Sequence, residues 1–254
     1  MNPCSLEMYF SGQGKPRLVL MNQKVSQIAI VTGGSHGIGK ALAIKLRNEG
    51  LKVVVADIRE PKDLPQEVFF RQCDVTRSQE IDALYQWVHQ ELGVPDILVL
   101  SAGQGIKERL TEGDPDKWQR VIDTNLMGPL RCIRSFVPSM LEKEAGNVVF
   151  LSSVSANQAY ENGGIYSASK TALEIVAETL RLETLPRLNV TTVAPGIVDT
   201  SFFQHQYSDQ TGVDQMDMGY LQAEDVAEDI WFALNKKPGS SINKIVCRPT
   251  KQSF

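Results

Sequence analysis

The sequence has few of the features that mark nucleic-acid-binding or membrane proteins. Its net charge is −4 and it contains no run of lysines and arginines, so no charge pattern favours nucleic acid or an anionic membrane as a partner. No stretch approaches the ~20 apolar residues of a membrane span. Residues 1–20 lack the apolar core of a secretory signal. We therefore expect a cytoplasmic protein with no nucleic-acid and no membrane partner.

Cysteine is also scarce. The four cysteines form no CxxC pair and have no histidine nearby; they are Cys4, Cys73, Cys132 and Cys247. This pattern favours free thiols in a reducing compartment over a disulfide framework or a zinc site. No metal is predicted, because His89 and His205 have no partners at ligand spacing.

Neither a low-complexity linker nor a fixed-period repeat divides the 254 residues. Short apolar runs alternate with stretches of helical spacing, and apolar residues on consecutive positions are typical of strands buried on both faces of a parallel sheet. The predicted strands are Ile28–Val31, Val53–Ala56, Val68–Gln72, Ile97–Leu100, Val148–Leu151, Val190–Val193 and Lys244–Cys247. The predicted helices are Ile38–Asn48, Ser78–Leu92, Pro115–Glu144, Tyr166–Leu185 and Ala223–Leu234.

This alternation predicts the α/β class: a single-domain Rossmann fold, with a doubly wound parallel sheet of about seven strands and helices on both faces. We expect the domain to span residues 24–254. Residues 1–23 are expected to be a disordered N-terminal extension, because residues 1–20 show no strand, helix or motif signal. Two alternatives for this segment are an upstream-start artefact, with Met21 as the functional start, and residues added for expression.

A glycine-rich turn joins the first predicted strand to the first predicted helix. Gly33, Gly37 and Gly39 lie in the run TGGSHGIG at residues 32–39. Missing side chains let the backbone approach a pyrophosphate, and the free N–H groups of a helix N-terminus favour its charge. A lone glycine turn can be only a tight turn, but strand, turn and helix here follow in the order that a dinucleotide site requires.

Asp57 ends the second predicted strand, near the ~20-residue offset at which an acidic side chain can accept hydrogen bonds from the adenosine ribose. Its charge would repel a 2′-phosphate, so NAD is predicted as the cofactor in preference to NADP. NADP stays open as the alternative, because Arg59 or Lys40 can reach such a phosphate.

Tyr166 and Lys170 lie four residues apart and so share one face of a helix, and Ser153 precedes the tyrosine by thirteen residues. A tyrosine with a pKa of ~10 is a poor base at neutral pH. A neighbouring ammonium group is expected to lower the pKa of Tyr166 toward useful acid/base chemistry. Ser153 can hydrogen-bond the same substrate oxygen.

Together these segments resemble the short-chain dehydrogenase/reductase family, single-domain type, over about residues 24–250. The resemblance is carried by TGGSHGIG at 32–39, Asp74, SAG at 101–103, Asn125, Ser153, YSASK at 166–170 and PGIVDT at 195–200. It implies an oxidoreductase that transfers a hydride between a nicotinamide cofactor and an alcohol or ketone. Serine at 101 departs from the asparagine common in relatives, but it can still form a hydrogen bond.

The resemblance also implies a role for each residue. Tyr166 is the general acid/base, Lys170 tunes it and binds the nicotinamide ribose, Ser153 orients the carbonyl, and Asn125 supports Lys170 through a water-linked proton relay. The implied cofactor-binding residues are Gly33, Ser35, His36, Gly37, Ile38, Gly39, Asp57, Ile58, Asp74, Val75, Ser101, Ala102, Gly103, Tyr166, Lys170, Pro195, Gly196, Val198 and Thr200.

Residues 201–221 are expected to form a lid over a small-molecule substrate. The lid contains no lysine or arginine, which disfavours phosphate, CoA or carrier-protein substrates unless Lys107 or Arg109 supplies a cation. A neutral alcohol or ketone is favoured, contacted by Ser155, Gln158, Phe202 and Phe203. The resemblance implies a homodimer or homotetramer built on the helices around 115–144 and 166–185.

Two other functions stay open. One is a catalytically silent dinucleotide-binding protein that senses redox state or acts as a scaffold, although an intact Ser153, Tyr166 and Lys170 argue against it. The other is a sugar-nucleotide epimerase or dehydratase, which usually needs a longer C-terminal domain than the 59 residues that follow Pro195.

Overall fold

The computed structural model describes residues 8–10, 16–18, 26–204, 218–237 and 239–253. Its centre is a seven-stranded parallel sheet in the order β5-β4-β3-β6-β7-β8-β9. The strands are β3 Ile28–Thr32, β4 Lys52–Asp57, β5 Phe69–Gln72, β6 Ile97–Leu100, β7 Gly146–Leu151, β8 Leu188–Pro195 and β9 Lys244–Cys247. The order reverses between β3 and β6, which is where ligands bind in doubly wound sheets. The predicted Rossmann fold is confirmed.

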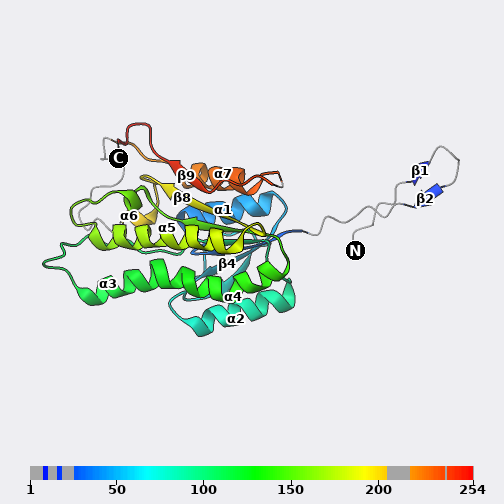
Figure 1. The fold of residues 1–254 in the computed structure, drawn as a ribbon, viewed down its shortest axis with the longest axis horizontal. Helices are drawn as coiled ribbons and strands as arrows, with labels where there is room; N and C mark the ends of the chain where they lie inside the picture. The colour runs from blue at the N-terminus through cyan, green and yellow to red at the C-terminus, as the bar shows by residue number, and fades with distance from the viewer. Residues whose placement is uncertain (1–7, 11–15, 19–25, 205–217, 238, 254) are drawn as a thin grey trace.

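Helices cover both faces of the sheet (Figure 1). On one face lie α1, Gly37–Asn48, and α7, Ala223–Leu234. On the other lie α2, Ser78–Glu91, α4, Gly128–Glu142, and α5, Gly164–Thr184. The inner strands β3 and β6 are sandwiched between helices, so their residues are buried on consecutive positions without polar alternation, whereas the edge strands β5 and β9 are partly exposed.

Successive residues of each inner strand pack into two separate hydrophobic cores, one on each face of the sheet. Ile28 and Ile30 of β3 pack with Phe136 of α4 and Leu173 of α5, while Ala29 and Val31 pack on the other face against α1 and α7. This division follows from the two-residue period of a strand, in which neighbouring side chains point to opposite faces. The apolar runs therefore stabilise both layers of helices at once.

The prediction of a single helix over 115–144 is wrong in the middle of that range. Helix α3, Pro115–Ile122, leads into a π-helical turn, η1, Asp123–Met127, which continues into α4. In the turn, the Gly128 N–H donates to the carbonyl of Asp123, five residues back. Pro129 has no N–H with which to reach the Asn125 carbonyl in an ordinary α-helix, so the sequence cannot keep α-helical bonding here.

The described part of the N-terminal segment forms two short antiparallel strands, β1 Met8–Phe10 and β2 Pro16–Leu18. They make a two-stranded sheet separate from the seven-stranded one. The prediction that residues 1–20 contain no strand is wrong for these six residues. Three residues are too few to show the alternation that identifies a strand in a sequence, and a two-stranded pair is marginally stable alone.

Candidate active site

A cleft of about 930 Å³ opens at the carboxyl ends of the central strands. The glycine turn after β3, Asp57 at the end of β4 and Ser153 after β7 all contribute to its lining, with the helix face that carries Tyr166 and Lys170. Parallel strands bring their carboxyl ends to the same edge of the sheet, so residues far apart in the sequence meet there. The cleft is large enough for a dinucleotide and a small substrate.

The glycine turn fits an extended ligand because its backbone is held where side chains have no room. Gly33 has φ +67°, and a Cβ built on it would lie 2.6 Å from Ala102 Cα. Gly37, with φ +53°, faces the Thr200 side chain. The turn therefore packs tightly on the segments after β6 and β8 and presents bare backbone, with the N-terminus of α1, to the cleft.

Thr32 and Ser101 connect the two strands at the point where the strand order reverses. Thr32 Oγ1 donates to the Val99 carbonyl at 3.2 Å and accepts from the N–H groups of Ser101 and Ala102. The Ser101 hydroxyl donates to the Thr32 carbonyl. Serine at 101 thus retains a polar bridge at the position where asparagine was expected, which keeps residues 101–103 against the glycine turn.

The Asp57 carboxylate is held in place by backbone donors. Its Oδ2 accepts from the Ser35 N–H at 3.0 Å and its Oδ1 from the Arg59 N–H at 3.3 Å. Ser35 Oγ donates to the Arg59 carbonyl at 2.7 Å. Asp57 and Arg59 both line the cleft, whereas Lys40 forms an ion pair with Asp63 at 2.7 Å. Of the two cations considered for a 2′-phosphate, Arg59 is therefore the one at the cleft.

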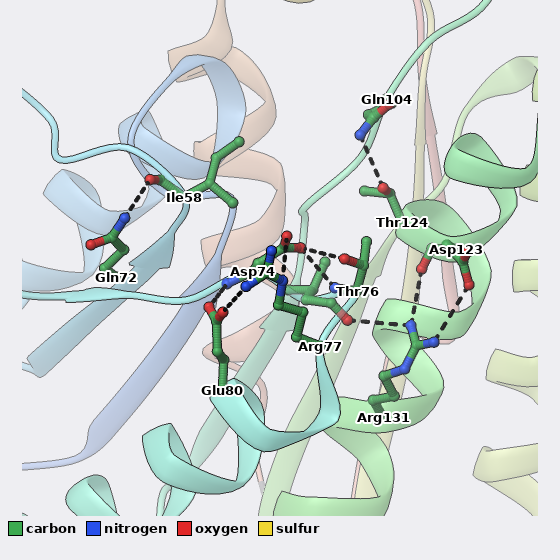
Figure 2. A network of polar contacts seen from close by, with 11 residues as sticks. Ile58, Gln72, Asp74, Thr76, Arg77, Glu80, Gln104, Asp123, Thr124 and Arg131 are labelled. Atoms are coloured by element: carbon green, nitrogen blue, oxygen red, sulfur yellow. Dashed lines mark hydrogen bonds and ion pairs between the residues drawn. The ribbon is translucent and has the colours of Figure 1, made fainter. Parts of the chain in front are cut away.

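Asp74 organises the turn after β5. Its Oδ1 accepts from both the N–H and the hydroxyl of Thr76, and its own N–H donates to Glu80 (Figure 2). Arg131 of α4 donates to the Val75 carbonyl and to Asp123 at the start of the π-helical turn. These bonds hold Asp74 and Val75, both in the cleft lining, against the turn that carries Asn125.

Tyr166 and Lys170 are both buried at the base of the cleft. Lys170 Nζ lies 5.9 Å from the centroid of the Tyr166 ring and donates to the Leu151 carbonyl at 2.7 Å. The Tyr166 ring packs at 5.8 Å from that of Phe202. Ser153 begins a short 3-10 helix, η2 Val154–Asn157, and its Oγ accepts from the Ser155 N–H at 3.2 Å.

The acid/base groups differ from the sequence prediction in one respect. Burial raises the pKa of Tyr166, an effect that the neighbouring Ser153 hydroxyl opposes and Tyr160 reinforces. Burial also lowers the pKa of Lys170 to about 8. Lys170 was expected to lower the pKa of Tyr166, but loss of solvation dominates because both groups are enclosed. Tyr166 is therefore a neutral phenol in this structure.

Asn125 lies outside the lining of the cleft and forms hydrogen bonds to the backbone of the loop after β6. Its Oδ1 accepts from the Gln104 N–H at 2.7 Å, and its Nδ2 donates to the Gln104 carbonyl at 2.9 Å and to Ser169 Oγ at 3.0 Å. Gly103 runs past both Asn125 and Lys170; a Cβ there would lie 3.4 Å from Asn125 Oδ1 and 3.6 Å from Lys170 Nζ.

Most of the predicted site residues line this one cleft. They are Gly33, His36, Gly37, Ile38, Gly39, Asp57, Ile58, Asp74, Val75, Ser101, Ala102, Gly103, Ser153, Ser155, Tyr166, Lys170, Pro195, Gly196, Val198, Thr200 and Phe202. Ser35, Asn125 and Gln158 do not: the first two act through the bonds given above, and Gln158 is exposed. The side chain of Phe203 and residues 205–217 of the predicted lid lie outside the described part of the chain.

The cleft also contains residues that sequence reasoning missed. Gln104, Tyr160, Ile197, Met218 and Gln252 all line it. Met218 could have been included, since it stands in the predicted lid. Gln252 had no signal: it belongs to no motif and lies 55 residues from its partner, Ile197.

Three cysteines in the described part of the chain, Cys73, Cys132 and Cys247, are free thiols. Burial raises the pKa of Cys73 and of Cys247 to about 12, so neither is a reactive thiolate at neutral pH.

Among the residues that the structure describes, no group of three or more histidine, cysteine or acidic side chains could hold a metal ion. None of the helices described is long and apolar enough to span a membrane.

Comparison with known proteins agrees with this geometry. The family model for short chain dehydrogenase matches residues 27–211, so the chain belongs to the short-chain dehydrogenase family. An uncharacterized oxidoreductase of Staphylococcus aureus strain MRSA252 is 32% identical over 237 residues, which cover 90% of this chain and all of that protein. A relative from Staphylococcus epidermidis with the same description is 30% identical over 233 residues, 88% of this chain and 97% of its own.

Solved structures of other proteins share this fold. The closed form of serine dehydrogenase complexed with NADP+ superposes with a TM-score of 0.85 at 25% identity, covering 90% of this chain and 97% of that one. The 3-ketoacyl-(acyl-carrier-protein) reductase of Brucella melitensis, complexed with NADH, has a TM-score of 0.80 at 21% identity, covering 90% and 99%. The second likeness concerns the fold alone.

Proposed function

We propose that this chain is a nicotinamide-dependent oxidoreductase that interconverts a small alcohol and the corresponding ketone, with Tyr166 as general acid/base. The observation that carries the proposal is the placement of Ser153, Tyr166 and Lys170 in the same cleft as the glycine turn. A dinucleotide site and a proton-transfer site that share one cavity are what hydride transfer at a carbonyl carbon requires.

The residues of the cleft fit a dinucleotide. Gly33 and Gly37 adopt positive φ against the segments that contain Ala102 and Thr200, so the turn presents backbone rather than side chains. Residues 37–39 begin α1, whose N–H groups would bind the pyrophosphate. Asp57 would accept from the adenosine ribose, Asp74 and Val75 would flank the adenine, and Thr200 would hold the carboxamide. When bound, the nicotinamide supplies or accepts the hydride.

The protein's own groups would handle the proton. Tyr166 is neutral in this structure, which is the form that gives a proton to a carbonyl oxygen during reduction. Ser153 would hydrogen-bond the same oxygen and orient it. Lys170, with its pKa lowered to about 8, would be charged below that pH and would favour the phenolate that Tyr166 becomes. For oxidation of an alcohol, the phenolate must form first, so the reductive direction suits neutral pH better.

NAD is proposed as the preferred cofactor, because the Asp57 carboxylate faces the cleft. The solved neighbours do not favour NAD, since three were solved with NADP or an NADP derivative and one with NADH. Arg59 also lines the cleft and would pair with a 2′-phosphate, so we expect discrimination rather than strict exclusion of NADP.

A homodimer or homotetramer is proposed for the assembly. Ile175 and Leu182 of α5 are 66% and 59% exposed, although most of the helix's apolar side chains, such as Leu173 and Leu180, pack into the core. Large apolar side chains exposed on one helix favour a partner surface there. Sedimentation of the purified protein would test this, and a monomer at all concentrations would contradict it.

The enzymatic proposal is tested by following the absorbance of the reduced nicotinamide while the protein is mixed with a panel of alcohols and ketones. We expect consumption of NADH with at least one ketone, and its production with the corresponding alcohol. Tight NADH binding without turnover of any compound in a broad panel would instead favour the catalytically silent dinucleotide-binding function.

A further inference from the structure

The C-terminal tail returns to the cleft after β9. The Gly196 N–H donates to the Cys247 carbonyl at 2.8 Å, and the next N–H, of Ile197, donates to the side-chain Oε1 of Gln252 at 3.1 Å. The Gln252 N–H donates to the Pro249 carbonyl at 2.9 Å, which closes a turn in the tail. Two consecutive backbone donors after β8 are thus satisfied by β9 and the tail.

The fit between the tail and this segment is tight. A Cβ at position 196 would collide with Gln252 Oε1 and lie 3.1 Å from Pro249 Cδ, so a side chain there would have to displace the Gln252 amide. Pro249 also lies beside Gly219, where the chain returns from the predicted lid; a Cβ there would be 3.8 Å from Pro249 Cβ. The tail therefore packs between the segment after β8 and the end of the lid.

The orientation of the Gln252 amide follows from its partner. Because the Ile197 N–H is a donor, the amide oxygen must face it, and the Nε2 group with its two N–H donors must point the other way. Gln252 is 8% exposed and lines the cleft. Among the described residues, Nε2 has no acceptor, and it is not one of the fully enclosed atoms left without a partner. Gln252 lines the cleft, so a ligand there can accept from these donors.

Amide donors that no described protein group accepts from need water or a ligand as their acceptor. We propose that Gln252 contacts the substrate and determines specificity, with Nε2 donating to a second oxygen of the substrate close to the reacting C–O group. The position of Pro249 against the end of the lid, with Met218 and Phe202 in the same lining, favours the substrate over the cofactor as the acceptor. This inference rests on the proposed function.

The test uses Gln252→Glu, which keeps an oxygen for the Ile197 N–H but replaces the donor with a second oxygen. Two pairs of probes supply the substrates: butane-2,3-dione with butan-2-one, and pentane-2,4-dione with pentan-2-one. Each pair differs by one acceptor oxygen, at two spacings. The ratio of kcat/KM for dione over ketone is measured for the wild type and the variant, so that the intrinsic reactivity of the dione cancels between them.

We expect that ratio to fall at least about tenfold in Gln252→Glu for one pair or both, because a donor is lost and two oxygens face each other. The dissociation constant for NADH should stay unchanged, and the melting temperature should stay above the assay temperature although a nearly buried carboxylate lowers it. Gln90→Glu makes the same change on the exposed face of α2, away from the cleft, and should leave the ratio as in the wild type.

An unchanged ratio for both pairs would overturn the inference while leaving the oxidoreductase proposal intact. A changed dissociation constant for NADH with an unchanged ratio would also overturn it, since Gln252 would then contact the cofactor. A wild-type protein that binds neither NADH nor NADPH would contradict the proposed function itself, and this inference with it.

Discussion

The Lys170 ammonium group donates a 2.7 Å hydrogen bond to the carbonyl oxygen of Leu151, at the end of β7. The bond ties the helix that carries Tyr166 to the strand that precedes Ser153. Enclosure has a cost, because a buried ammonium loses the solvation of its charge and its pKa falls to about 8. Burial places Lys170 in the site but lowers the free energy of unfolding of the protein.

This cost predicts how stability depends on pH. Between pH 8 and 10.5 the unfolded chain holds the Lys170 proton more firmly than the folded protein does, so the free energy of unfolding rises with pH through this window. Relative to a Lys170→Met variant, the wild type should gain about 2 kcal/mol between pH 7 and pH 10. Urea unfolding at both pH values measures the difference. Lys52→Met, at an exposed position, is the control, and equal pH dependence in all three proteins would contradict the prediction.

Gly33 and Gly50 offer a matched test of the glycine turn. Both have positive φ, but a Cβ at Gly33 would meet the Ala102 backbone, whereas one at Gly50 would meet nothing within 4 Å. We expect Gly50→Ala to lower the free energy of unfolding by about 1 kcal/mol, the cost of the backbone conformation alone. Gly33→Ala should cost about 2 kcal/mol more and should also abolish NADH binding. Equal losses of stability in the two variants would show that the turn is not closely packed.

Asp57 tests the choice of cofactor. Like charges a few ångströms apart cost a few kcal/mol at an effective dielectric constant of ~20, or on the order of a hundredfold in affinity. The wild type should therefore bind NADH more tightly than NADPH, with Arg59 recovering part of the loss for NADPH. Asp57→Asn keeps an acceptor for the Ser35 N–H and removes the charge, so it should narrow the gap between the cofactors. Tighter binding of NADPH than of NADH by the wild type would show that Asp57 does not accept hydrogen bonds from the adenosine ribose.

The fold could be predicted from the sequence because its inner strands, such as β3 and β6, are buried on both faces. Runs such as those at 28–31 and 97–100 are apolar without interruption, and the glycine turn marks where the first strand ends. The π-helical turn could not be read from helical spacing, because Asp123–Met127 contains no helix-breaking residue and departs from an α-helix in its hydrogen bonds. The proline at 129 was the one local signal.

Some residues of the candidate site could likewise be predicted from the sequence, and others could not. Tyr166 and Lys170 could be predicted as neighbours, because one helical turn separates them. Gln252 could not, because its contact with Ile197 depends on how the tail packs after β9. The direction of the Tyr166 pKa shift was also beyond the sequence, because it depends on how completely the surrounding segments enclose the phenol. Spacing shows which groups meet, whereas burial decides their charge.

Tyr166→Phe tests the central claim most directly. The phenylalanine ring still packs beside Phe202, but no oxygen remains to exchange the substrate proton. With a ketone that the wild type reduces, turnover should fall ~10²–10⁴-fold, while the dissociation constant for NADH stays nearly the same. Near-normal turnover in the purified variant would contradict the claim that Tyr166 is the general acid/base.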